Sequence, residues 1–231
     1  MTPSRRSSGG RRAVTREAVL ADPETRQLID MADHYLDAIG YTNHGLSHVQ
    51  RVSDNARRIV LDLGLAERDA ELAGIAGLMH DIGNVIHRND HAKSSALLSF
   101  DILRRLEMPL AEIAAIAGAI GNHDESDGDP VSVPSAALII ADKCDVIRSR
   151  VRNKNMIHWD IHDRVNYAVE GSNVRVEREA HLITLELDID TSISQIMEYF
   201  EIFLDRMKIS RRAANYLNCD FRLVMNGATL S

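Results

Sequence analysis

The sequence contains little cysteine and no long apolar run. Only Cys144 and Cys219 occur in its 231 residues, and neither belongs to a CxxC spacing. Neither a disulfide framework nor a thiolate zinc site is therefore indicated. No apolar stretch approaches the ~20 residues of a membrane-spanning helix, and the basic N-terminus lacks the apolar segment of a secretion signal. These absences predict a cytoplasmic protein without a membrane partner.

An excess of positive charge is also missing. The chain carries 27 Lys and Arg against 34 Asp and Glu, which gives a net charge of −7. Because a general nucleic-acid binder needs a positive field, we expect no nucleic-acid partner. The hydrophobic content of 45% and charged content of 26% are typical of an ordinary globular protein. Residues 1–18, where arginines cluster, are predicted to be a mobile N-terminal arm.

Apolar residues recur with helical spacing through most of the chain. In the first such stretch Asp22 can cap a helix, Pro23 suits its first position and Gly40 suits its end. The pattern predicts a mainly α protein whose helical domain covers residues 19–170. The expected helices span residues 21–40, 46–63, 66–80, 90–107, 110–123 and 134–152, with a shorter one at 159–169.

The pattern changes after Gly171. Residues 173–190 alternate with period two around a polar centre, which predicts an antiparallel hairpin. A long helix is expected over residues 192–217, and residues 221–227 could return as a third strand. Residues 171–231 are thus predicted to form a small α+β subdomain. Its sheet edge could pair with a second copy in a homodimer, or the subdomain could act as a lid.

Polar, ligating side chains lie on or beside the apolar faces of successive helices. Asp142 follows the apolar run "AALIIA", where a carboxylate is costly to bury unless it is paired or bound to a cation. A single such histidine is most often a hydrogen-bonded structural residue, but repetition across helices is how bundles build interior metal sites. The candidates are His48, His80, Asp81, His91, His123 and Asp142.

These residues, in the order H…HD…H…H…D, resemble the HD superfamily of metal-dependent phosphohydrolases. The segments "HGLSHVQRV", "LMHDIGN", "HAKSSALL", "IGNHDE" and "ADKCD" carry the likeness, which covers residues 25–155. It implies an HD-domain helical bundle and a metal-activated water that cleaves a phosphate ester. It also implies two divalent transition-metal ions: His48, His80, Asp81 and Asp142 hold the first, and Asp81 bridges to a second held by His91 and His123.

The donor set contains imidazoles and carboxylates but no thiolates, which suits Fe, Mn, Zn, Co or Ni. The expected partner is a small phosphorylated substrate, either nucleotide-like or another phosphate ester. The same ligands would serve an HD-type di-iron oxygenase, and a non-catalytic ligand-binding regulator is a third alternative. Asn84 and Asp124 depart from the pattern of the cyclic-dinucleotide phosphodiesterases in this superfamily. The substrate and the number of ions stay open.

Side chains beside this pattern are candidates for substrate contact. His44 precedes His48 by four residues and could either reach the substrate or cap a loop. His87 competes with His91 as a ligand and otherwise belongs to the pocket rim. Lys143 and Arg148 supply cations for a phosphate, unless they form a solvated basic face. The expected catalytic residues are Asp81, His44 and Lys143, and the expected substrate-binding residues are His44, His87, Lys143 and Arg148.

Overall fold

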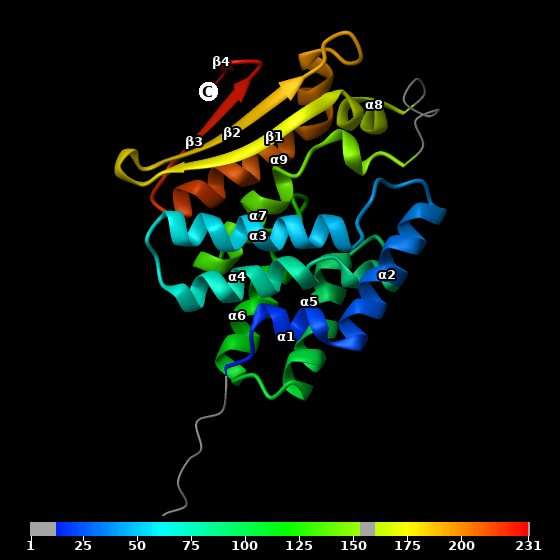
Figure 1. Cartoon of the computed structure of the whole chain (residues 1–231), viewed down its shortest axis with the longest axis vertical. Helices are drawn as coiled ribbons and strands as arrows, with labels where there is room; N and C mark the ends of the chain where they lie inside the picture. The colour runs from blue at the N-terminus through cyan, green and yellow to red at the C-terminus, as the bar shows by residue number, and fades with distance from the viewer. Residues whose placement is uncertain (1–12, 153–159, 231) are drawn as a thin grey trace, which may run out of the picture.

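A computed structural model of the chain describes residues 13–152 and 160–230, and its helical body lies below a small sheet (Figure 1). The helices are α1 (Arg16–Ala21), α2 (Pro23–Ala38), α3 (Leu46–Asp62), α4 (Glu67–Met79), α5 (His91–Arg105), α6 (Leu110–Gly121), α7 (Val133–Lys143), α8 (Ile161–Ala168) and α9 (Ile196–Tyr216). The strands are β1 (Val169–Glu177), β2 (Leu182–Ile189), β3 (Asp220–Met225) and β4 (Ala228–Thr229). The prediction of a mainly α fold with a small C-terminal α+β segment is confirmed.

The helix boundaries follow from local capping. The Asp22 carboxylate accepts a hydrogen bond from the Thr25 amide at 3.0 Å, and Pro23 occupies the first turn of α2 as predicted. Gly40 adopts a φ of +87° just after α2, a conformation that costs glycine little. Asp22 and Pro23 thus mark the start of α2, and Gly40 marks its end, as the sequence pattern predicts.

Two predicted boundaries are wrong. The expected arm over residues 1–18 overlaps α1, which Thr15 caps and whose Val19 side chain is buried. Residues 1–12 of the expected arm lie outside the described residues. The expected helix over residues 134–152 ends at Lys143. Beyond it the chain folds back, because the Arg150 side chain donates hydrogen bonds to the backbone oxygens of Asn43 and Asp145 at 3.0 and 2.8 Å.

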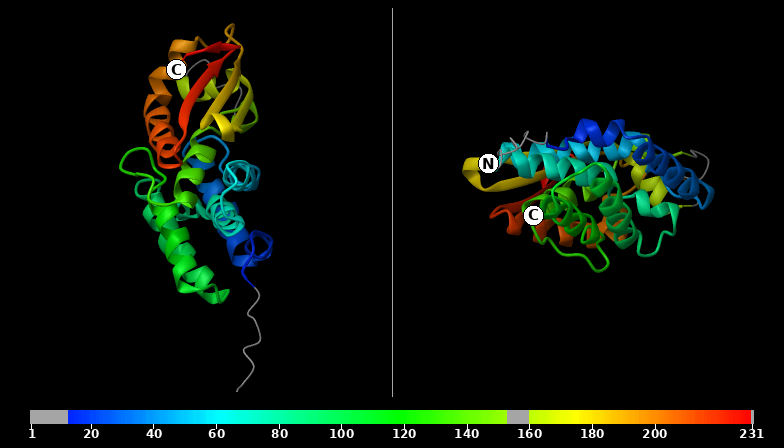
Figure 2. Two further views of the ribbon diagram at one scale, coloured as in Figure 1. Left: turned by 90° about the vertical axis from the view of Figure 1, so that its left-hand side faces the viewer. Right: turned by 90° about the horizontal axis from the view of Figure 1, so that it is seen from below.

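The sheet has the strand order β1-β2-β3-β4 (Figure 1) and lies at one end of the molecule (Figure 2, left). Strands β1 and β2 form the predicted antiparallel hairpin, with Val174 opposite Leu185. Strand β3 runs parallel to β2, because the chain returns through α9 before it rejoins the sheet. The short β4 pairs antiparallel with β3 and was not predicted. The hairpin, the long helix and the third strand are therefore confirmed.

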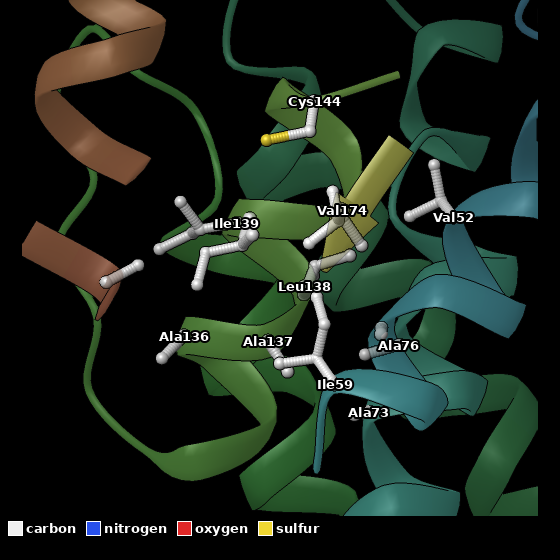
Figure 3. Close-up of a cluster of buried hydrophobic side chains, with 14 of the residues drawn as sticks. Val52, Ile59, Ala73, Ala76, Ala136, Ala137, Leu138, Ile139, Cys144 and Val174 are labelled. Carbon is white, nitrogen blue, oxygen red and sulfur yellow. The ribbon is translucent and has the colours of Figure 1, made fainter. Parts of the chain in front are cut away.

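Helix α7 lies at the centre of the molecule and carries Asp142 near its end. Residues 134–143 of this helix are all buried, as expected of a helix whose apolar residues are not confined to one face. Side chains of α3, α4 and β1 pack around it, and it also contacts α9. Figure 3 shows this core around Val52, Ile59, Ala76, Leu138 and Val174. One continuous core thus joins the helical body to the C-terminal elements.

Within residues 13–152 and 160–230, no helix combines the length and the apolar character that crossing a bilayer would require.

Candidate metal centre and adjoining cavity

The histidines and aspartates predicted as ligands converge from the ends of separate helices. His48 lies in the first turn of α3, His91 begins α5 and Asp142 lies in the last turn of α7. His80 and Asp81 directly follow α4, and His123 follows α6. All are buried, with exposed fractions between 0 and 9%. The Nε2 atoms of His48 and His80 lie 3.3 Å apart, as do those of His91 and His123.

The Asp81 carboxylate lies between these two histidine pairs. Its Oδ1 is 3.4 Å from Nε2 of His91, whereas its Oδ2 is 3.2 Å from Nε2 of His80 and 3.7 Å from that of His48. Asp142 Oδ1 approaches the Nε2 atoms of His48 and His80 at 3.5 and 3.6 Å. Asp81 therefore offers one oxygen to each half of the cluster.

Each histidine is oriented by a hydrogen bond from its other ring nitrogen. The Nδ1 atoms of His80, His91 and His123 donate to backbone oxygens three residues earlier, at 2.9, 3.1 and 2.7 Å. His48 Nδ1 donates to the Asp145 carboxylate at 2.6 Å. Metal-binding histidines usually make such a bond, which leaves Nε2 as the free donor atom.

This donor set fits divalent transition metals. It combines imidazole nitrogens and carboxylate oxygens without sulfur, as Fe, Mn, Zn, Co or Ni prefer. Two groups have donor atoms that all lie within 4.8 Å of one another: His48, His80 and Asp142, and His80, Asp81 and His123. Asp124, whose carboxylate lies 3.5 Å from His91 Nδ1, can orient that ring.

Opposing charges set the protonation of the metal-free cluster. Burial lowers the pKa of His80, but the carboxylates of Asp81 and Asp142 more than offset burial and raise this pKa to about 10. Burial also opposes ionisation of Asp81, yet the charge of His80 holds its pKa well below the usual range. Burial and the charge of Lys143 lower the pKa of His123 to about 3. The metal-free cluster therefore holds a proton on His80.

Metal binding should displace this proton. Near pH 8 we expect release of about one proton per ion bound at His80, and an apparent affinity that rises about tenfold per pH unit from pH 7 to 9. Competition weakens as the pH approaches the His80 pKa of about 10, so the rise flattens there. Calorimetry in buffers of different ionisation enthalpy measures the release. A binding enthalpy independent of buffer, with a pH-independent affinity, contradicts this protonation state.

A cavity of about 440 Å³ adjoins the cluster. His44 lines it and is only 8% exposed, with its ring centroid 5.5 Å from that of His48. His44 Nδ1 donates to the Thr42 oxygen at 2.6 Å, and burial together with the charge of Arg150 holds its pKa well below the usual value. A neutral His44 with a free Nε2 thus borders the cavity.

Lys143 is buried in a double ion pair rather than exposed to the cavity. Its Nζ lies 2.7 Å from Asp142 Oδ2 and 2.6 Å from Glu125 Oε2, and it is 5% exposed. Burial lowers its pKa, but these two carboxylates raise it above the ordinary value. Glu125 also pairs with Arg206 of α9 at 3.3 Å. Helix α9 is thereby connected to Asp142 of the cluster through three successive ion pairs.

Two predicted substrate contacts lie elsewhere. Arg148 donates to the Tyr167 oxygen at 2.6 Å and pairs with Glu170 at 3.0 Å, because α7 ends before it. His87 is exposed, and its Nδ1 accepts from the Asn89 amide at 2.9 Å. Neither residue lines the cavity. Arg150 takes the place expected of Arg148, and His91, not His87, joins the cluster.

Sequence reasoning missed cavity residues outside the histidine pattern. Arg206 lies on an amphipathic helix with no motif around it, and Glu125 lies in a loop. Arg88 is in the segment between His80 and His91 but matches no part of the ordered set. Among these cavity residues, only Arg150 had a signal in the sequence, because it lies in a run of basic residues.

Comparisons with known proteins agree with this site. Residues 45–147 match the family model of the HD domain, and this range includes every ligating candidate. The chain therefore contains an HD domain. It is 25% identical over 183 residues to an uncharacterized protein of Methanocaldococcus jannaschii, covering 69% of this chain and 70% of that protein.

Two solved structures are also similar. A predicted HD superfamily hydrolase from an uncultured Thermotogales bacterium is 25% identical with a TM-score of 0.42, and the match covers 57% of this chain and 73% of that one. A protein from Lactobacillus plantarum is 20% identical with a TM-score of 0.43, and the match covers 85% of this chain and 89% of that one.

Proposed function

We propose that this HD domain protein is a metal-dependent phosphohydrolase that cleaves a phosphate ester of a small molecule. The observation that carries the proposal is the Asp81 carboxylate, which faces two histidine pairs beside an arginine-lined cavity. Carboxylates that face two sets of donors are suited to paired ions, and paired ions are suited to phosphoryl transfer.

The ligating side chains would divide between two ions. His48, His80 and Asp142 would hold one, His91 and His123 the other, and Asp81 would be shared. When bound, the ions would lower the pKa of a water molecule and polarise the phosphoryl group. Asp81 could serve both ions, because it offers one oxygen to each half of the cluster.

The remaining polar residues would bind and orient the ester. Arg88, Arg150 and Arg206 line the cavity and would neutralise charge on the phosphoryl oxygens. His44, neutral with its proton on Nδ1, would accept a hydrogen bond at its free Nε2 from a donor in the cavity. Lys143 would act by holding Asp142 and Glu125 in place, because its charge is already engaged by both carboxylates.

The test combines metal analysis with a substrate screen. Purified protein should contain a divalent transition metal and should hydrolyse at least one phosphomonoester, diester or nucleotide when Mn²⁺ or Fe²⁺ is added. Asp81→Asn should lower both metal content and hydrolysis, the latter by at least about 100-fold, since even indirect partners of metal ligands contribute 10–100-fold. Asp101→Asn, at an exposed position of α5, is the matched control. Full metal content and activity in Asp81→Asn would exclude the proposed centre.

A further inference from the structure

The cavity contains a buried carboxylate without a partner. Asp163 of α8 lines the cavity and is 9% exposed, and among residues 13–152 and 160–230 it makes no hydrogen bond or ion pair. Burial and the nearby Asp160 both raise its pKa. Because buried carboxylates are almost always paired, Asp163 lacks a cation or donor that a bound molecule can supply.

Two further polar residues, at the start of α8 and within it, line the cavity near Asp163. Asp160 lines the same cavity, and its carboxylate accepts a hydrogen bond from the His162 amide at 2.7 Å. Asn166 lies one turn after Asp163, is 5% exposed, and donates through Nδ2 to the His162 oxygen at 2.8 Å. Asn166 also lines the cavity, and within the described residues its amide oxygen accepts no hydrogen bond. The His162 ring approaches Asp160 at 3.3 Å but makes no ion pair with Asp163.

Positive charge in the cavity gathers beside the metal-ligating cluster. Arg206 reaches the cluster through Glu125 and Lys143, and Arg150 contacts the backbone oxygen of Asp145. Arg88 donates to Asn84, whose own amide donates to Asp81 at 3.0 Å. The residues that line the cavity are therefore arginines beside the cluster and carboxylates at α8.

The aromatic side chains of the cavity are already covered. The Arg88 guanidinium lies 5.3 Å from the centroid of the Tyr41 ring, and that of Arg206 lies 4.5 Å from the centroid of Phe203. Phe203 is only 2% exposed and offers no surface for a nucleobase, and the Arg88 guanidinium already covers one face of Tyr41. The polar groups of α8 are therefore a better guide to the bound molecule than stacking on these rings.

We propose that the substrate is a small aliphatic phosphate ester with a primary amine, whose ammonium group binds Asp163 while its phosphate lies at the arginines. This inference rests on the proposed phosphohydrolase function. An ammonium group has three donors and no acceptor, which matches the oxygens of Asp163, Asp160 and Asn166. A hydroxyl group would leave the charge of Asp163 uncompensated. A cavity of about 440 Å³ accommodates a molecule of this size.

Two matched series of compounds test the proposal: ω-aminoalkyl phosphates of two to six carbons, and the ω-hydroxyalkyl phosphates of equal length. The wild-type protein should give a higher kcat/KM for the amine at one or more chain lengths. Asp163→Asn should reduce kcat/KM for that amine by about 10- to 100-fold, as expected for loss of a charged hydrogen bond, and should leave the hydroxyl series unchanged. Asp163→Glu keeps the charge and should retain the preference, and Asp101→Asn should behave as wild type.

The outcomes separate this inference from the proposed function. Equal kcat/KM for amine and hydroxyl compounds at every length would overturn the amine assignment and leave the phosphohydrolase intact. Absence of hydrolysis for every phosphate would overturn the phosphohydrolase. In that case, calorimetric binding of the same compounds to metal-free protein decides the inference. Tighter binding of the amines that is lost in Asp163→Asn supports it, and equal binding of both series overturns it.

Discussion

Lys143→Met should lower the free energy of unfolding of the metal-free protein by about 3–5 kcal/mol, because it removes a buried cation that pairs with both Asp142 and Glu125. Lys143 lies 2.7 Å from Asp142 and 2.6 Å from Glu125, and only 5% of it is exposed. Methionine fills a similar volume, so lost packing contributes little to the expected change. Urea unfolding of protein stripped of metal measures it.

Lys93→Met is the matched control. Lys93 also lies between two carboxylates, at 2.7 Å from Asp90 and 2.8 Å from Asp127, but its side chain is 58% exposed. Solvent screens such pairs, so this substitution should leave the free energy of unfolding nearly unchanged. If both variants lost a similar free energy of unfolding, burial would not be the reason that the Lys143 ion pairs stabilise the protein.

Gly77→Ala should destabilise the protein and weaken metal binding together. A Cβ atom at Gly77 would lie 2.7 Å from Cα and 2.8 Å from N of Ser53, so the backbones of α3 and α4 would have to separate. Overpacking of this kind costs about 1–3 kcal/mol. His48 follows the start of α3 and His80 the end of α4, so the shift would also displace their Nε2 atoms, now 3.3 Å apart.

Gly118→Ala provides the comparison for this effect. Gly118 lies inside α6, and the nearest atom to an added Cβ there is Val131 Cγ2 at 3.9 Å. Alanine is favoured over glycine in a helix by about 0.5–1 kcal/mol, so this variant should be as stable as wild type or more so. Thermal unfolding and metal titration of both variants check the prediction. Unchanged metal affinity in Gly77→Ala would mean that the two helices adapt without moving the histidines.

The helices and the ligand cluster were predictable because their signals are local. Asp22 and Pro23 mark a helix start through interactions within one turn. His80 and Asp81 end an apolar helix, and His91 begins the next one. Since each ligand lies at a helix end with a recognisable apolar face, the ordered pattern was enough to predict that the side chains converge.

The cavity was not predictable, because it depends on how distant segments pack. Helical spacing continues beyond Lys143, yet the chain turns there because Arg150 binds the backbone of Asn43, more than a hundred residues earlier. Arg206 and Asp163 belong to α9 and α8, whose sequences contain no motif. Their position relative to the cluster follows only from contacts of α9 with α7 and of α8 with α9.

The candidate metal ligands and one wall of the cavity belong to different parts of this chain. The HD family match ends at residue 147 and contains every ligating candidate. One wall of the cavity, with Asp163, Phe203 and Arg206, comes from α8 and α9 beyond that limit. Under the proposed function, replacement of the C-terminal elements during evolution would change which ester the cavity accepts while the candidate metal ligands stayed as they are.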